Sequence, residues 1–254
     1  AEQLRRREVS LLGAFVPVAL SDPAAQADGE AKVLRTARLL AEAHRRARFD
    51  AAPFLVLADN NGTDPVRTRH AGRVEPSMGL SDAQWEVFAK GANHLARAIK
   101  QETGLRTVFH HHCAGFVETP NEIGRLLALT DPELVGLVFD TGHYTFGSGR
   151  YDRGAVREGL ERFADRIWYV HLKDCAPGVA EAARRENLDY FGAVRRGVFC
   201  ELGRGCVDFP EVVSWLKQRQ YDGWAVVEQD VLPGLGTPRQ SAQRNRDYLK
   251  SLGL

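Results

Sequence analysis

The stretch FHHHCAGFVETPNEIGRLLALTDPELVGLVFDTGH, residues 109–143, contains the pattern that decides the fold. Apolar runs predict strands at 106–111 and 134–140, and a helix is expected between them at 119–129. The helix has a clear start, because Thr119 is followed by a proline and by the glutamate of a capping box. A strand, a helix and a second strand in this order predict a unit whose two strands run parallel.

The same alternation runs through the whole chain. Further strands are predicted at 10–18, 53–58, 166–172 and 223–229, and further helices near 24–48, 81–103, 152–164, 208–219 and 237–251. Most of these strands are apolar at both alternating positions, which is typical of parallel strands covered on each face. The sequence therefore predicts an α/β fold of the TIM (β/α)8-barrel type, as one domain over residues 1–254.

Six predicted strands are two fewer than a closed eight-stranded barrel contains. The chain begins with Ala1 and leads almost directly into the first strand. We therefore expect one or two N-terminal βα units to be missing from this chain, or to lie where the sequence gives no strand signal.

Composition excludes several classes of function. The chain has 34 Lys and Arg against 33 Asp and Glu, so it lacks the basic excess of nucleic-acid-binding proteins. No apolar run reaches the length of a transmembrane helix. The basic and then apolar N-terminus is interpreted as ordinary structure rather than a signal peptide, because VPVALSDPA continues as strand and loop. The four cysteines form no CxxC pair, so we expect reduced thiols and a cytoplasmic protein.

Two segments are longer than ordinary loops. Residues 59–80 and 174–207 each follow a predicted strand, at the end where α/β barrels build their sites. The second segment contains a helical stretch, VAEAARRENLDYF (179–191), which we interpret as a lid. At the end of this segment and the start of the next helix, ELGRGCVDF (201–209) resembles a glycine-rich anion loop, but tight turns are the favoured use of its glycines.

Polar side chains recur where the apolar strands end. They are His110, His111, His112 and Glu118 after one strand, Asp140 and His143 after the next, His171, Lys173 and Asp174 in VHLKD, and Glu228 and Asp230 in VVEQD. A single Asp or His at a strand end is more often a helix cap or a solvent contact, but four strand ends agree here. Carboxylates and imidazoles without paired thiolates suit Mn²⁺, Co²⁺, Mg²⁺ or Zn²⁺. The sequence thus predicts a shared divalent-metal site.

The three consecutive histidines cannot all face the barrel centre. Alternation along a strand places His110 and His112 on one side and His111 on the other. At most two of them are therefore expected in the site.

Residues 109–143, followed by VHLKD, ELGRGCVDF and VVEQD, resemble the inosose dehydratases of the xylose-isomerase-like barrel superfamily. The resemblance extends over residues 9–254. Members of that family usually carry two βα units before the part that matches VSLLGAFVPVAL (9–20), in agreement with the six predicted strands.

The resemblance implies a Glu-Asp-His-Glu metal set. Asp140, His171 and Glu228 match three of its members. The first glutamate lies on the strand in the related sugar epimerases, where this chain has histidines, so Glu118 is taken as the fourth ligand. His110 or His112 are the alternatives for that place, or contacts for the substrate. Mn²⁺ or Co²⁺ is the expected ion.

The implied reaction is the dehydration of a cyclic polyol ketone, 2-keto-myo-inositol, through an enediolate in inositol catabolism. We expect Glu228 or Glu118 to act as the base. The acid is expected among His110, His112 and His143, and these three histidines are also the expected substrate contacts. Lys173 is expected to contact the oxyanion.

Three other functions compete with this interpretation. A sugar isomerase or epimerase shares the metal and the enediolate but returns the proton. Endonuclease IV is disfavoured by the balanced charge. The third alternative is a barrel that binds a ligand without turnover. A small polyol ketone or sugar is the expected partner, without nucleic acid or membrane, and the chain is compatible with a homo-oligomer.

Overall fold

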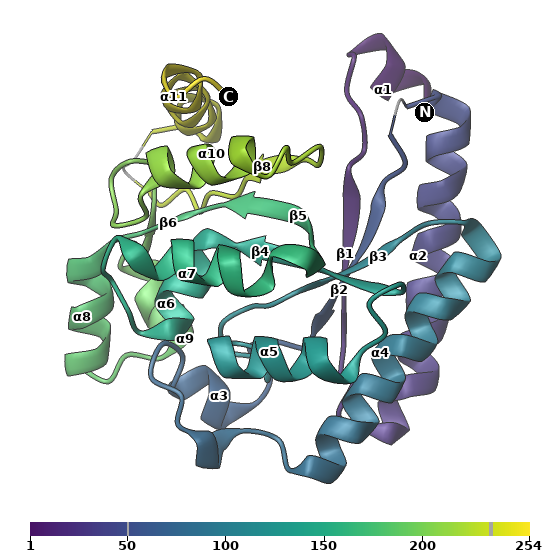
Figure 1. The fold of residues 1–254 in the computed structure, drawn as a ribbon, viewed down its shortest axis with the longest axis horizontal. Coiled ribbons are helices and arrows are strands. Elements are labelled where there is room, and N and C mark those ends of the chain that lie inside the picture. Colours follow the sequence, from purple (N-terminus) through teal and green to yellow (C-terminus); the bar gives the residue numbers. More distant parts are fainter. Residues whose placement is uncertain (50, 234–235) are drawn as a thin grey trace.

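A computed structural model describes residues 1–49, 51–233 and 236–254. Six parallel strands form one sheet in the order β1-β2-β3-β4-β5-β8. They are β1 (Gly13–Val18), β2 (Phe54–Asp59), β3 (Thr107–His110), β4 (Val135–Asp140), β5 (Ile167–Leu172) and β8 (Ala225–Val227). The sheet curls into a half-barrel, from β1, nearly vertical in Figure 1, to β5 and β8, which lie nearly across the view.

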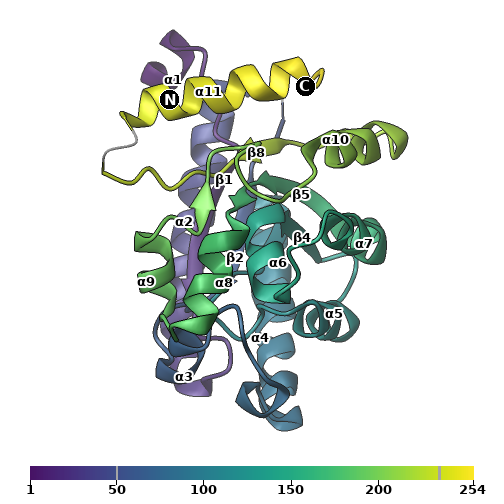
Figure 2. The same cartoon turned by 90° about the vertical axis from the view of Figure 1, so that its left-hand side faces the viewer.

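Helices cover the convex side of this sheet and its ends (Figures 1 and 2). They are α1 (Glu2–Arg6), α2 (Gln26–Ala47), α3 (Pro65–Arg69), α4 (Asp82–Thr103), α5 (Pro120–Leu129), α6 (Thr141–Ser148), α7 (Gly154–Phe163), α8 (Pro177–Arg185), α9 (Tyr190–Arg195), α10 (Phe209–Gln218) and α11 (Pro238–Ser251). None of the helices in the described residues combines the length and the apolarity that crossing a bilayer requires.

The two longest helices, α2 and α4, pack side by side against the first strands. Helix α4 begins at a capping box on Ser81 and ends at Gly104, whose φ of 72° is a left-handed conformation. Its apolar side chains recur every three or four residues, so one face is buried, as Phe88, Leu95 and Ile99 show.

The core has two parts because each strand alternates its side chains. On β2, Leu55 and Leu57 point into the large cluster under the helices. Val56 points the other way and joins a smaller cluster with Val138 and Tyr169 on the concave side. The concave side is therefore partly apolar, and polar groups are confined to the strand ends.

Every predicted strand and helix of the alternating pattern is confirmed, with ends displaced by at most three residues. One helix was not predicted, and one local prediction was wrong. Helix α6 follows β4 at once because Asp140 caps it. The stretch 179–191 is two helices, α8 and α9, because Asn187 adopts a left-handed φ of 54° between them. The single-domain boundary of 1–254 stays a prediction.

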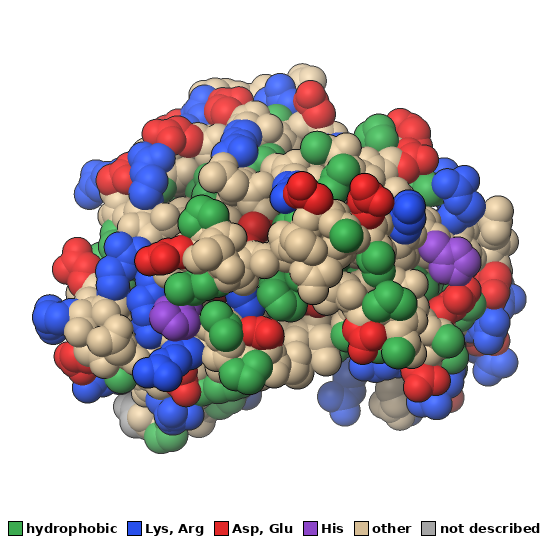
Figure 3. Space-filling view, turned by 90° about the horizontal axis from the view of Figure 1, so that it is seen from below, with side chains coloured by type: hydrophobic (Ala, Val, Ile, Leu, Met, Phe, Trp, Pro, Cys, Tyr) green, Lys and Arg blue, Asp and Glu red, His purple; other side chains and the backbone are tan. Residues whose placement is uncertain are grey.

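The long segment 174–207 also forms a small antiparallel sheet of β6 (Asp174–Cys175) and β7 (Phe199–Cys200). This sheet and helices α8 and α9 stand beside the strand ends of the half-barrel (Figure 2). On the face seen in Figure 3, acidic and basic side chains are interspersed.

Candidate metal centre

Four side chains from four strand ends meet at one point. They are His110 at the end of β3, Asp140 at the end of β4, His171 on β5 and Glu228 directly after β8. One nitrogen or oxygen atom of each lies within 4.8 Å of the other three. These four residues are termed the cation cluster.

Asp140 gives the clearest sign of a missing partner. Its Oδ1 accepts a hydrogen bond of 2.7 Å from the backbone N–H of His143 and so caps α6. Its Oδ2 is buried and has no hydrogen-bond partner among the described residues. That oxygen lies 3.7 Å from His110 Nε2 and 3.7 Å from His171 Nδ1. A carboxylate oxygen buried without a partner is costly, so a cation at this point would compensate it.

The spacing of the cluster fits a divalent ion. Nitrogen and oxygen donors bound at about 2.1 Å from one ion lie roughly 3.0–3.4 Å from their neighbours. Here His171 Nδ1 is 2.9 Å from Glu228 Oε2 and 3.2 Å from His110 Nε2, while His110 Nε2 is 3.8 Å from Glu228 Oε2. Two imidazoles and two carboxylates therefore form a donor set of the right size and type.

Electrostatics keep the carboxylates of the cluster ionised. Burial alone would raise the pKa of Glu228, but the hydrogen bond from His171 and the charge of Lys173 outweigh it and lower the pKa to about 2. Burial likewise opposes ionisation of Asp140, yet the surrounding imidazoles hold its pKa well below the usual range. Both carboxylates are thus negative at neutral pH and available as ligands.

A second group of polar side chains lines the wall beside the cluster. The rings of His112 and His143 are 3.9 Å apart, and His143 Nε2, buried and without a hydrogen-bond partner in the described part of the chain, is 4.0 Å from Glu228 Oε1. Burial lowers the pKa of His112 to about 4 and holds the pKa of His143 well below its usual range. Both rings are therefore neutral.

Lys173 approaches the same carboxylate from the other side. Its Nζ is 2.8 Å from Glu228 Oε1 and 3.2 Å from Asp230 Oδ2. Burial works against the ammonium charge, but Glu228, Asp140 and Asp230 outweigh it and raise the pKa of Lys173. A buried and fully charged ammonium is thus held beside the cluster.

A cavity of about 410 Å³ opens onto the cluster, which is enough for a small cyclic polyol. His110, His171 and Glu228 lie on one side of it, and Phe15 and Tyr169 supply apolar surface.

Glu118, predicted from the sequence as the fourth ligand, lies outside the cluster. Its two carboxylate oxygens accept the backbone N–H groups of Gly72 and Ala114 at 2.6 and 2.7 Å. It is fully buried, and burial raises its pKa to about 7. The chain turns back after β3, where the N–H of His112 donates to the carbonyl of Val117, and this turn carries Glu118 away from the strand end. His110, the alternative given by the sequence, occupies the fourth corner.

The other predicted positions follow strand geometry. His111 points away from the cavity, and its Nε2 accepts the N–H of Asp140 at 3.1 Å, as alternation predicted. The prediction of turns in 201–209 is confirmed: Gly203 has a φ of 80°, and its N–H and that of Gly205 both donate to Asp174 Oδ2. This loop binds a carboxylate of its own chain.

Sequence reasoning missed Tyr190. This residue begins α9, and its ring centre lies 5.5 Å from that of His112 and 6.5 Å from that of His143. The signal that could have identified it is its place in the stretch 179–191, because an aromatic residue in a predicted lid is a candidate for contact with the site.

Comparison with known proteins agrees with this fold. The family model of the xylose isomerase-like TIM barrel matches residues 10–252. An inosose dehydratase of Geobacillus kaustophilus is 40% identical over 78% of this chain and 63% of its own length. One of Clostridium beijerinckii is 36% identical over 82% of this chain and 68% of its own length. The chain belongs to the inosose dehydratase family of xylose isomerase-like TIM barrels.

The chain spans only about two thirds of the length of these inosose dehydratases. Among solved structures, the IOLI protein with a bound zinc atom is similar, with a TM-score of 0.65. It is 14% identical, and the match covers 99% of this chain and 80% of that one. At this identity the likeness shows the fold alone.

Proposed function

We propose that this protein is a metal-dependent hydro-lyase that dehydrates 2-keto-myo-inositol in inositol catabolism. The observation that carries the proposal is the cation cluster in a chain of the inosose dehydratase family, with the Oδ2 of Asp140 left without a hydrogen-bond partner among the described residues. The free cysteines are compatible with a reducing compartment, so we propose that it acts in the cytoplasm.

His110, Asp140, His171 and Glu228 would hold the metal, with Mn²⁺ or Co²⁺ proposed ahead of Mg²⁺ or Zn²⁺. A divalent ion bound there supplies Lewis-acid polarisation of a ketone, which makes the neighbouring C–H more acidic. In this proposal His110 replaces Glu118, because Glu118 already binds two backbone amides.

The neighbouring side chains divide the proton transfers. His143 Nδ1 accepts the backbone N–H of Cys113 at 3.5 Å, so the neutral ring carries its proton on Nε2 and can donate it to the departing hydroxyl, which leaves as water. Glu228 is the base that takes the α-proton, and the Lys173 ammonium, whose pKa is raised, stays charged and stabilises the oxyanion that forms. Glu228 Oε1 orients Lys173, and His112 and Tyr190 form the wall against which the substrate ring would rest.

Incubation of the protein with 2-keto-myo-inositol and Mn²⁺ tests the function. We expect a conjugated dione to accumulate, visible by its ultraviolet absorbance, and chelation by EDTA to stop its formation. A ring that is epimerised without loss of water would instead identify an isomerase or epimerase, the alternative that uses the same groups. If the substrate is unchanged although the metal is bound, the protein is a barrel that binds a ligand without turnover.

A further inference from the structure

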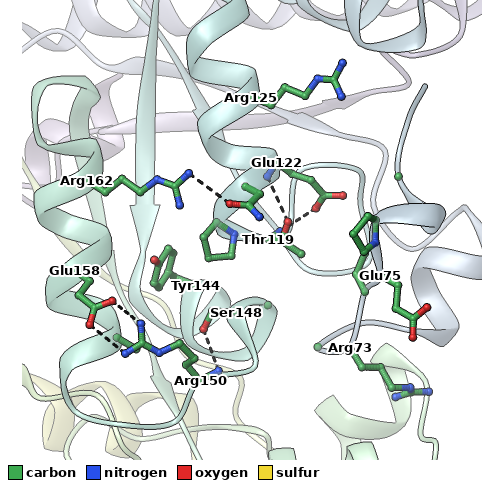
Figure 4. Close-up of a pocket in the computed structure, with 18 of the residues that line it drawn as sticks. Arg73, Glu75, Thr119, Glu122, Arg125, Tyr144, Ser148, Arg150, Glu158 and Arg162 are labelled. Atoms are coloured by element: carbon green, nitrogen blue, oxygen red, sulfur yellow. Dashed lines mark hydrogen bonds and ion pairs between the residues drawn. The ribbon is translucent and has the colours of Figure 1, made fainter. Parts of the chain in front are cut away.

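A second and larger cavity, of about 620 Å³, lies away from the cation cluster and has no lining residue in common with it. Its walls come from the loop that precedes α4, the start of α5, the second half of α6, and α7 (Figure 4). Nothing in the proposed dehydration uses this cavity.

The floor of the cavity is apolar and aromatic. Trp85, Leu80 and Tyr144 line it and are almost fully buried. Burial raises the pKa of Tyr144, and the charges of Arg162 and Arg150, which line the same cavity, lower it in part. A ligand with a small ring could rest on such a floor.

The rim of the cavity carries an excess of positive charge. Five arginines and three glutamates line it. Two of these glutamates are already neutralised, Glu122 by Arg67 and Glu158 by Arg150.

Three of the arginines have no carboxylate to bind among the residues that the structure describes. Arg73 donates to the carbonyls of Arg69 and Leu188, Arg184 donates to the carbonyl of Gly72, and Arg162 reaches the side-chain oxygen of Asn121. Figure 4 shows Arg162 and Arg73 on opposite sides of the cavity, with Thr119 and Tyr144 between them.

Like charges are also crowded on this rim. Burial lowers the pKa of Arg73, and the neighbouring Arg69 and Arg184 lower it further. An Nε–H of Arg73 is buried without a partner in the described residues. Guanidinium groups gathered in this way lack the counter-charge that a bound oxyanion supplies, often with two parallel hydrogen bonds to one group.

We propose that this cavity binds a small organic anion, a ring-sized molecule that carries a phosphate or carboxylate group. The anionic group is held by Arg73 and by Arg184, which donates to the carbonyl of Gly72 next to Arg73. The body of the molecule rests on Trp85 and Tyr144, and Arg162 on the opposite side of the cavity binds a further oxygen of the molecule. The site is separate from the cation cluster and does not depend on the proposed dehydratase activity.

Isothermal titration calorimetry of the intact protein with three molecules of similar size tests the proposal. The probes are glucose 6-phosphate, gluconate and glucose, which carry a phosphate, a carboxylate and no charge. We expect at least one of the anions to bind about tenfold or more tightly than glucose, and the stronger of the two identifies the anionic group. If neither anion binds more tightly than glucose, the proposal is wrong.

Matched variants locate the binding. Arg162→Gln and Arg184→Gln should each weaken binding of the anion about fivefold, as expected for a partly exposed ion pair. Arg97→Gln removes the same charge from the exposed side of α4, outside the cavity, and should have no effect. Equal effects of Arg162→Gln and Arg97→Gln would overturn the proposal. So would loss of anion binding in Asp140→Asn, because the anion would then occupy the cation cluster.

Discussion

Two buried carboxylates, Asp140 and Glu118, differ in what their oxygens contact. Both are fully shielded from solvent, and both follow strands of the same sheet. Glu118 uses both oxygens to accept backbone N–H groups. Asp140 uses one oxygen to cap α6 and leaves the other without a partner among the described residues, between two imidazoles.

The difference separates a carboxylate with a structural role from the one that we propose as a metal ligand. Glu118 ties the loop at Gly72 to the turn at Ala114, and each of its oxygens accepts a hydrogen bond from a backbone N–H. Asp140 keeps a lone pair on Oδ2 for which the described part of the chain provides no hydrogen-bond donor. Burial is therefore a poor guide to chemistry on its own, and the count of satisfied hydrogen bonds is a better one.

The largest expected effect is that of Asp140→Asn. The amide keeps an oxygen to cap α6 but loses the charge, so bound metal should disappear and turnover of 2-keto-myo-inositol should fall by about 10³-fold or more. Metal analysis measures the bound metal, and the dione assay measures turnover. Asp208→Asn is the control, because Asp208 caps α10 in the same way and lies outside the cluster. If Asp140→Asn retained its metal and its turnover, Asp140 would not be a metal ligand and would differ from Glu118 in no functional respect.

Glu118→Ala should act on stability instead. It leaves two buried backbone N–H groups without acceptors and a cavity in place of the side chain, which together cost about 4 kcal/mol. Urea unfolding measures the free energy of unfolding, and Glu181→Ala on the exposed side of α8 is the control. A variant that is as stable as the parent but binds no metal would show that Glu118 is a ligand, as the sequence suggested.

The pH dependence of stability sharpens the role of Glu118. Its pKa of about 7 in the folded protein exceeds the ordinary value of 4.5, because burial favours the protonated form. Its contribution to stability is thus fully present below pH 4.5 and is lost as the pH rises through about 7. The stability of the parent relative to Glu118→Gln should fall by roughly 3 kcal/mol across this range. Thermal unfolding of both proteins between pH 4.5 and 8 measures it, and parallel curves would contradict the raised pKa.

The smallest expected effect concerns the fourth corner of the cluster. His110→Ala removes one of the four proposed donors, a nitrogen, so the affinity for Mn²⁺ should weaken by about 100-fold. His94→Ala, on the exposed side of α4, should leave the affinity unchanged. Titration with Mn²⁺ followed by electron paramagnetic resonance measures it. Equal affinities in the two variants would exclude His110 as a ligand.

Much of the fold was predictable because it depends on local patterns. Apolar runs of the length of a strand, and helices that begin at capping residues such as Thr119 and Ser81, are recognisable within a few residues of sequence. The parallel arrangement follows from their alternation. Helix α6 was missed because its two glycines suggest a turn, whereas the buried surroundings of β4 and the cap at Asp140 stabilise a helix.

The sequence by itself determined that carboxylates and imidazoles stand at the ends of neighbouring strands, because strand period and strand order fix which edge they share. The resemblance to the inosose dehydratases then selected Asp140, His171 and Glu228 among these residues. Only the tertiary structure decided between His110 and Glu118, since that choice depends on the path of the turn after β3 and on which backbone amides the turn brings to Glu118. The arginine-rimmed cavity was equally invisible, because its residues lie far apart along the chain and become neighbours only when the helices pack.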